Sequence, residues 1–457
     1  MWHPTLRKGT KPIYEQLIEG LEHDVAKGVL SPGHQLPPQR DLAYRLKIGV
    51  GTVTKVYAEA RRRGLLTATV GRGSFIAGPS DEAAKADGDR MIDFSRNLSP
   101  TAAAATHLAE TLSTLRRRGD LTDHLSYAPP AGMTAHRQAA AKWLASSAGF
   151  TADWQRLVIC GGGQQAMTLA FAALCKAGDT VMTESATFFG MRALADQLGI
   201  RLQGLKMDAQ GLTPEALDRA AASGAKILYT IPALQNPTGR IMGAKRRADI
   251  AAIARKRDLI VVEDDVYTPF VRGEHDLPPL ATLIPERTFY IATLSKVIAP
   301  GLRCGYLLAP NDEHLDRVIR AVRAFSYAPA AFGALIGTQW IEDGIAQTIA
   351  ASVKREIALR TELASKILGK AIEGPHAKVS PHVWLPMSEL TAERVAGAAL
   401  RAGVSVTPPS APIVDATEIS GLRLCIGAPR DMTTLERGLK IVADALTGTP
   451  DTTRAVV

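Results

Sequence analysis

Three short stretches of the sequence place amide, carboxylate, hydroxyl and amine groups directly after apolar runs that look like β-strands. In an open α/β sheet, ligands bind in the crevice at the carboxyl ends of the strands. Groups of these types at such positions are therefore candidates for one shared active site. The stretches are Asn236-Pro237-Thr238-Gly239 after residues 226–231, Glu263-Asp264-Asp265-Val266-Tyr267 at the end of 259–263, and Thr293-Leu294-Ser295-Lys296 after 288–292.

The apolar runs belong to a longer alternating pattern, which predicts how the site is held. Strands that alternate with helices predict a mostly parallel sheet with helices on both faces. From about residue 320 the pattern is mainly helical and then mixed, so we expect a long helix and a smaller α+β subdomain. The strand-like runs are 180–183, 226–231, 259–263, 288–292 and 305–309, and the helical stretches are 164–176, 190–199, 213–222 and 243–257.

Each polar stretch alone has an ordinary explanation. An Asn-Pro-Thr-Gly sequence is usually a turn, a Ser-Lys pair is usually exposed, and an acidic pair often caps a helix. Together, in this order and followed by Pro300-Gly301-Leu302-Arg303, they resemble the fold-type I aminotransferases that depend on pyridoxal 5'-phosphate (PLP). The resemblance implies PLP as cofactor, bound through its aldehyde to a lysine amine.

The resemblance also implies a role for each polar side chain. Lys296 would form the imine with PLP, and Asp264 would face the pyridine nitrogen and keep the ring protonated as an electron sink. Asn236 and Tyr267 would donate to the ring hydroxyl oxygen. The phosphate needs cations, hydroxyls and a helix N-terminus. The residues that match this need are Arg303, Ser295, Thr293 and the helix-opening turn Gly161-Gly162-Gly163-Gln164-Gln165, with Gly163 and Gln164 as the contacts.

Three further positions follow from the same resemblance. Phe188 matches the aromatic side chain that stacks on the ring, although the family commonly has proline and tyrosine where this chain has Ala186 and Phe188. Tyr127 matches a tyrosine that reaches the phosphate of the neighbouring subunit. Arg423 matches the arginine that grips the α-carboxylate of an amino acid, since a guanidinium makes two parallel bonds to it. A salt bridge at a strand edge is the alternative for Arg423.

The first 77 residues show a different pattern. Apolar residues at helical spacing from Tyr14 to Val25 predict one helix, a second should start near Pro38, and a break at Gly49-Val50-Gly51 precedes a third. Two β runs, Leu65 to Val70 and Ser74 to Ala77, meet at a Gly-Arg-Gly tip. Three helices and a basic hairpin predict a winged helix-turn-helix that binds double-stranded DNA. A small helical adaptor with a solvated charged face is the alternative.

The motifs of this segment resemble the GntR-type winged helix, including Leu36-Pro37-Pro38-x-Arg40 and Gly71-Arg72-Gly73-Ser74-Phe75. The resemblance implies that Arg40, Thr52 and Arg72 contact DNA, with Thr54 and Lys55 as neighbours on the third helix. Where the family often has a Ser-Arg pair, this chain has Gly49-Val50, so its operator should be read differently or more weakly.

Charge supports a small basic module joined to a nearly neutral body. Residues 1–80 carry 12 Lys and Arg against 6 Asp and Glu, whereas the other 377 carry 42 against 39. A GntR-type head on an aminotransferase-like body is the MocR architecture. We expect a winged helix in 1–77, a linker in 78–90, an aminotransferase-like domain in 91–447 and a tail in 448–457.

The resemblance implies a bacterial transcriptional regulator that forms a head-to-tail homodimer and responds to an amino-acid-like amine or to PLP itself. The alternative is an active aminotransferase with an accessory DNA-binding domain, and a third possibility is that PLP is not bound. Transaminase activity, if present, should be weak. The sequence has no membrane span or signal peptide, and its four cysteines show no metal spacing. We therefore expect a cytoplasmic protein without a metal.

Overall fold

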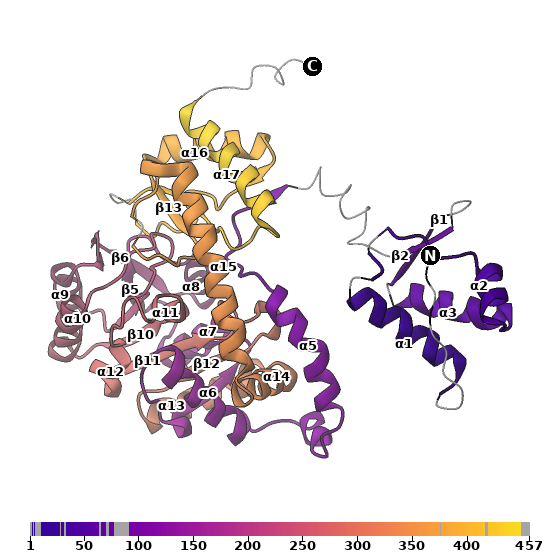
Figure 1. The fold of residues 1–457 in the computed structure, drawn as a ribbon. Coiled ribbons are helices and arrows are strands. Elements are labelled where there is room, and N and C mark those ends of the chain that lie inside the picture. The colour runs from indigo at the N-terminus through magenta and orange to yellow at the C-terminus, as the bar shows by residue number, and fades with distance from the viewer. Residues whose placement is uncertain are drawn as a thin grey trace. The chain divides into compact units, whose positions relative to one another are not determined.

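The computed structural model describes residues 2, 4, 11–27, 29–31, 33–63, 65–69, 73–76, 91–374, 376–415 and 419–448. The chain forms two compact units, Met1–Arg90 and Met91–Val457, which are shown in Figure 1. The predicted linker 78–90 and residues 449–457 of the predicted tail lie outside the described residues, so those boundaries stay predictions. None of the described helices combines the length and the hydropathy that crossing a bilayer requires.

The first unit is a winged helix, as predicted. Its elements are α1 (Ile13–Ala26), α2 (Gln39–Leu46), α3 (Val50–Arg62), β1 (Leu66–Thr69) and β2 (Gly73–Ile76). β1 and β2 pair antiparallel. The buried core includes Tyr57, whose hydroxyl donates to Pro37 O at 2.7 Å.

The predicted break before the third helix was too wide. Lys47 has a left-handed φ of 53° and ends α2, and extended Gly49 precedes α3. These two residues complete the turn, so Val50 and Gly51 already belong to α3. The second helix starts at Gln39, one residue after Pro38.

The second unit is built on a seven-stranded sheet in the order β4-β12-β11-β10-β9-β5-β6. β12 is antiparallel to both neighbours, and the other six strands run in one direction, so the sheet is mostly parallel, as predicted. Two of the strands were missed from the sequence, β4 and β6. The strands are β4 (Leu157–Cys160), β5 (Thr180–Glu184), β6 (Arg201–Leu205), β9 (Ile227–Thr230), β10 (Ile260–Asp264), β11 (Thr288–Thr293) and β12 (Gly305–Leu308).

Helices cover both faces of this sheet because successive strand residues point to opposite sides. Leu228 and Val261 pack in a cluster with residues of α9 and α10, whereas Tyr229 and Val262 pack on the other side with residues of α7. The flanking and connecting elements are α5 (Ala102–Leu115), α6 (Thr134–Ser147), α7 (Gly163–Leu174), α8 (Phe189–Leu198), β7 (Met207–Asp208), β8 (Gly211–Leu212), α9 (Pro214–Ala222), α10 (Ala244–Arg257), α11 (Thr268–Val271), α12 (Leu280–Leu283) and α13 (Asp312–Phe325).

The predicted long helix and smaller α+β subdomain are present. In Figure 1, α15 runs from the part that contains α16 and α17 to α14. Short β3 at the start of the unit pairs parallel with β14, so the chain enters the unit through this subdomain. The elements are β3 (Ile92–Asp93), α14 (Ala331–Glu342), α15 (Ile345–Leu368), β13 (Val383–Pro386), α16 (Glu389–Arg401), β14 (Val404–Ser405), β15 (Gly421–Leu424) and α17 (Met432–Thr447).

Candidate functional site

A cavity of about 160 Å³ lies at the carboxyl ends of the central strands, where the sequence predicted the site. Ten residues that the sequence singled out line it together. They are Gly163, Gln164, Phe188, Asn236, Asp264, Tyr267, Thr293, Ser295, Lys296 and Arg303, joined by Met167, Ile231 and Val266. Among the described residues, no cluster of His, Cys, Asp and Glu could hold a metal ion.

Asp264 is the last residue of β10 and is buried. Its Oδ2 accepts a hydrogen bond of 2.6 Å from the hydroxyl of Tyr229, which lies on neighbouring β9. Its Oδ1 has no hydrogen-bond partner among the described residues. Burial raises the pKa of Asp264 to about 6, against the opposing effects of Tyr229 and Lys296. This carboxylate is therefore held at one oxygen and can accept from a proton donor at the other.

Lys296 follows β11, the strand that pairs with β10. Its Nζ donates to Asn97 O at 2.8 Å. Burial lowers the pKa of Lys296 to about 8. A larger fraction of the amine is therefore neutral, and so nucleophilic, near neutral pH than for an exposed lysine.

A chain of hydrogen bonds joins Tyr267, Asn236 and Arg423. The Tyr267 hydroxyl accepts from Asn97 Nδ2 at 2.9 Å and from Asn236 Nδ2 at 3.4 Å. Its own proton therefore remains available as a donor. Asn236 Oδ1 in turn accepts from Arg423 Nη1 at 2.7 Å.

Arg423 lies on β15 of the smaller subdomain and is only 3% exposed. Its Nη2 donates to Ser95 O and Thr407 Oγ1, both at 2.7 Å, and its Nε has no partner within the described part of the chain. All these partners are neutral, so the salt bridge that was the alternative is not formed by the described residues. The guanidinium is a buried cation next to the cavity residue Asn236, which suits capture of a carboxylate.

The phosphate end is assembled from β11, β12 and the start of α7. Arg303 Nη2 donates to Gly161 O at 2.7 Å. Gly162 has a φ of 91°, a backbone conformation that favours glycine, and the Arg303 guanidinium lies close to it, since a Cβ there would lie 2.8 Å from Arg303 Nη2. Thr293 Oγ1 donates to Cys304 O at 2.8 Å and lies 2.9 Å from Ser295 Oγ. A cation, two hydroxyls and a helix N-terminus therefore converge, as an anion site requires.

The two aromatic residues from the sequence lie in different places. Phe188 lines the cavity and packs edge-on against Phe189, with ring centroids 4.9 Å apart. Tyr127 does not line the cavity; it is 82% exposed and packs edge-on against Tyr327. The structure of one chain thus leaves Tyr127 accessible for contact with another molecule.

Two residues that the sequence did not indicate complete the site. Asn97 Nδ2 bonds both to Tyr267 and, at 3.2 Å, to His382 Nδ1. Burial lowers the pKa of His382 to about 3, so its ring is neutral. A proton on Nε2, which lies 3.2 Å from Gln235 O, satisfies both ring nitrogens. Neither residue follows the end of an apolar strand-like run, which was the signal used to find the others; His382 instead comes directly before β13.

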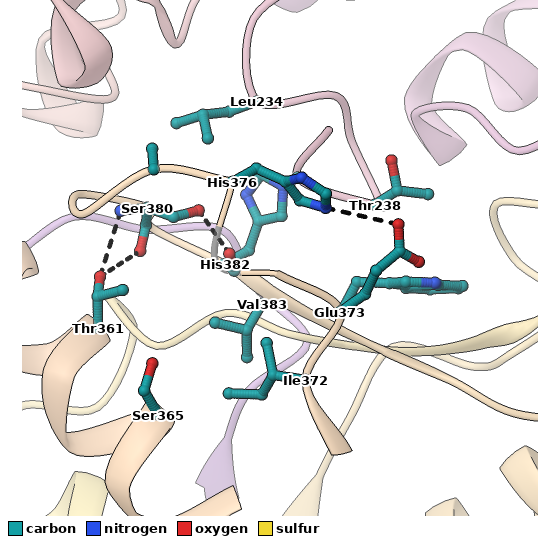
Figure 2. A pocket seen from close by; sticks show the side chains of 13 residues that line it. Leu234, Thr238, Thr361, Ser365, Ile372, Glu373, His376, Ser380, His382 and Val383 are labelled. Carbon is teal, nitrogen blue, oxygen red and sulfur yellow. Dashed lines mark hydrogen bonds and ion pairs between the residues drawn. The ribbon is translucent and has the colours of Figure 1, made fainter. Parts of the chain in front are cut away.

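A second, smaller cavity of about 20 Å³ lies beside His382 and is shown in Figure 2. It has room for a single water molecule. Ser380 Oγ donates to His382 O at 2.6 Å, and Thr361 exchanges hydrogen bonds with Ser380. Glu373 Oε1 lies 3.5 Å from His376 Nε2. These contacts fix the loop that carries His382, so we regard this cavity as structural.

The larger cavity fits PLP on three counts. The unpartnered Asp264 Oδ1 matches a protonated ring nitrogen, the Lys296 amine matches an aldehyde, and Arg303 with the start of α7 matches a phosphate. Nothing in the described lining opposes such an occupant. The roles of the individual residues remain predictions.

In the first unit, four of the five predicted DNA contacts lie on α2 and α3. Arg40, Thr54 and Lys55 are exposed, and Thr52 is half-buried. Thr54 Oγ1 donates to Gln39 Oε1 at 2.8 Å, which joins the start of α2 to α3. Arg72 lies outside the described residues.

Comparisons with known families agree with both units. Residues 89–442 match the family described as "Aminotransferase class I and II", and residues 13–76 match "Bacterial regulatory proteins, gntR family". A relative from Bacillus subtilis (strain 168), named "Uncharacterized HTH-type transcriptional regulator YdeF", is 30% identical over 96% of both chains. The "HTH-type pyridoxine biosynthesis transcriptional regulator PdxR" of Corynebacterium glutamicum is 28% identical over 69% of both chains.

Solved structures confirm the fold of the second unit. An archaeal alanine:glyoxylate aminotransferase superposes with a TM-score of 0.72 at 23% identity, covering 86% of this chain and 96% of that one. LysN, an α-aminoadipate aminotransferase from Thermus thermophilus, gives a TM-score of 0.68 at 24% identity. The match covers 86% of this chain and 98% of that one. The chain therefore belongs to the aminotransferase class I and II family and carries a GntR-family regulatory domain at its N-terminus, the combination found in MocR-type transcriptional regulators.

Proposed function

We propose that the second unit binds PLP in the larger cavity and an amino-acid-like effector at Arg423, and that their binding controls the attachment of the first unit to an operator in double-stranded DNA. The observation that carries this proposal is the buried carboxylate of Asp264. One of its oxygens is held by Tyr229 and the other has no partner in the described structure, in the same cavity as Lys296 and Arg303.

PLP would supply an electrophilic aldehyde and an electron-withdrawing ring. Lys296 offers a partly neutral amine to that aldehyde, because burial lowers its pKa to about 8. Asp264, ionised above about pH 6, would keep the ring nitrogen protonated. The Tyr267 hydroxyl, which already accepts two hydrogen bonds, has its proton left to donate. Arg303 would hold the phosphate end.

The effector proposal depends on Arg423. Within the described residues its buried guanidinium has an unpartnered Nε and only neutral partners, so an amine that carries a carboxylate provides the missing negative charge. Hydrogen bonds between a guanidinium and a carboxylate are stronger than hydrogen bonds between neutral groups. The effector class is therefore an amino acid or a close analogue.

We also propose a head-to-tail homodimer in which Tyr127 serves the site of the partner subunit. Its 82% exposure in the single chain supports this. The test mixes Tyr127→Phe protein with Lys296→Ala protein after reversible dissociation. Each mixed dimer should contain one complete site and recover the PLP affinity that both parents lack. Failure to recover any tight binding in the mixture would contradict the shared site.

The principal experiment is a titration of the full chain with PLP, followed by visible absorbance and by binding to DNA from its own upstream region. Lys296→Ala should abolish the absorbance of lysine-bound PLP. Lys354→Ala is the matched control, because it removes another partly buried lysine that does not line the cavity. Loss of the absorbance in the control, or its survival in Lys296→Ala, would refute the assigned role.

An aminotransferase activity is the second candidate, because the cavity contains the Lys296 amine, the Asp264 carboxylate and the Arg303 guanidinium together. Steady-state amino transfer by the purified protein would support it. Specific operator binding that is lost when residues 1–90 are removed would support the regulatory function.

A further inference from the structure

Residues Ile92–Ser99, here named the entry segment, lie near the start of the second unit and contact the key residues of the site through two backbone carbonyls and one side-chain hydroxyl. Ser95 O accepts from Arg423 Nη2 at 2.7 Å, and Asn97 O accepts from Lys296 Nζ at 2.8 Å. Ser99 Oγ donates to the carbonyl of Lys296. The two cationic side chains proposed to bind cofactor and effector therefore both donate to this one segment.

The entry segment is also firmly tied to the smaller subdomain. Ile92 N donates to Gly403 O and Phe94 N to Ser405 O, at 2.9 and 2.7 Å, and Cys425 N donates to Phe94 O at 2.9 Å. A side chain on Gly427 would have no room, because its Cβ would lie 2.2 Å from Leu98 O. The segment is thus packed closely enough that a change in its contacts must be accommodated by its neighbours.

Only Met91 separates the entry segment from Arg90, the last residue of the first unit. The entry segment is therefore the part of the site that lies nearest to the winged helix along the chain. Other parts of the site, such as Asp264 and Arg303, lie far along the sequence from the first unit.

We propose that the entry segment transmits the occupancy of the site to the DNA-binding unit. A ligand that engages the Lys296 amine competes with Asn97 O, and a carboxylate on Arg423 competes with Ser95 O. In each case one backbone carbonyl of the entry segment loses its hydrogen bond, and the segment is held by fewer contacts. This inference rests on the proposed function, because it needs ligands at Lys296 and Arg423.

Asp93 offers a way to disturb the segment without altering a ligand-binding side chain. Its Oδ1 accepts from both the N–H and the hydroxyl of Ser95, at 2.7 and 2.6 Å, and so fixes the turn that presents Ser95 O to Arg423. Asp153 makes the same kind of turn elsewhere, since its Oδ1 accepts from Gln155 N at 3.0 Å. Asp93→Ala is therefore the test variant and Asp153→Ala the matched control.

The first experiment measures hydrogen–deuterium exchange of the peptide 91–100 in the full chain, with and without PLP, and with L-alanine added as a carboxylate probe. PLP should change the exchange of this peptide, and Lys296→Ala should remove that change. PLP absorbance without any change in exchange would overturn the inference and leave the proposed PLP site intact. Absence of PLP absorbance would refute the proposed function, and the inference with it.

The second experiment measures affinity for DNA from the chain's own upstream region with and without PLP. Asp93→Ala should keep the PLP absorbance, which shows that the site is folded. In the wild type, PLP should change the DNA affinity about fivefold or more, as is usual for coupled sites. In Asp93→Ala, PLP should leave the DNA affinity nearly unchanged. Asp153→Ala should retain the wild-type change. Wild-type coupling in Asp93→Ala would overturn the inference.

Discussion

Replacing Asp264 by asparagine should stabilise the protein in the absence of PLP, by an amount that depends on pH. The carboxyl has an ordinary pKa of 3.8, and burial raises it to about 6. At about 1.4 kcal/mol per pH unit, the ionised group costs the folded protein about 3 kcal/mol. The asparagine of the variant would carry no charge, and its side-chain oxygen would still accept the hydrogen bond from Tyr229.

The direction of this pH dependence follows from the pH at which the folded and the unfolded chain each release the proton of Asp264. Above pH 6 the group is ionised in both the folded and the unfolded chain, so its full cost is present. As pH falls through 6, the folded protein takes up the proton first and the cost shrinks, reaching about 1.6 kcal/mol at pH 5. The advantage of Asp264→Asn over wild type should therefore grow by about 1.4 kcal/mol between pH 5 and pH 8.

Urea unfolding at several pH values, followed by tryptophan fluorescence, measures this difference. Four of the five tryptophans (Trp143, Trp154, Trp340 and Trp384) belong to the second unit, so the signal reports mainly on it. A difference that stays constant from pH 5 to pH 8, or that shrinks as pH rises, would refute the reasoning. Saturating PLP should make the wild type more stable than Asp264→Asn, because only the wild-type carboxylate gains a charged partner.

Three further predictions concern other parts of the chain. Arg303→Ala should weaken PLP binding about 10- to 100-fold in an absorbance titration, because hydrogen bonds to charged groups are worth about 1.5–3 kcal/mol; unchanged affinity would place the phosphate elsewhere. Gly305→Ala should lower both the melting temperature and PLP affinity, because its Cβ would lie 2.6 Å from the carbonyl carbon of Gly162; wild-type values in both assays would contradict the close packing. Lys55→Ala should reduce the slope of log affinity against log salt by about 0.9 if this exposed lysine neutralises one phosphate; an unchanged slope in operator titrations would remove it from the interface.

The sequence predicted much of the site because its chemistry lies at strand ends. Buried parallel strands read as continuous apolar runs, and the polar residues that follow them must meet at one edge. The runs that end near Asn236, Asp264 and Lys296 became β9, β10 and β11, and these residues line one cavity. Family resemblance added Arg423, which the structure places one hydrogen bond away from Asn236.

β4 was missed although Leu157–Cys160 is itself a continuous buried apolar run, but the other missed features have no comparable local signal. β6 is an edge strand of mostly half-buried and exposed residues, so its sequence lacks an apolar run. β3 has only two residues and owes its existence to pairing with β14, more than 300 positions later. Asn97 and His382 are 285 residues apart and meet only after both parts have folded. Such contacts depend on tertiary packing, which periodicity in a single stretch does not report.

Because β12 runs opposite to its neighbours, its start lies at the same edge as the end of β11, and Lys296 and Arg303 are joined by one short return of the chain. All seven strands of the sheet have been synthesised once the ribosome reaches Leu308, and Arg423 follows 115 residues later. Each new chain therefore contains every residue that lines the proposed cofactor cavity before it acquires the side chain proposed to recognise the effector.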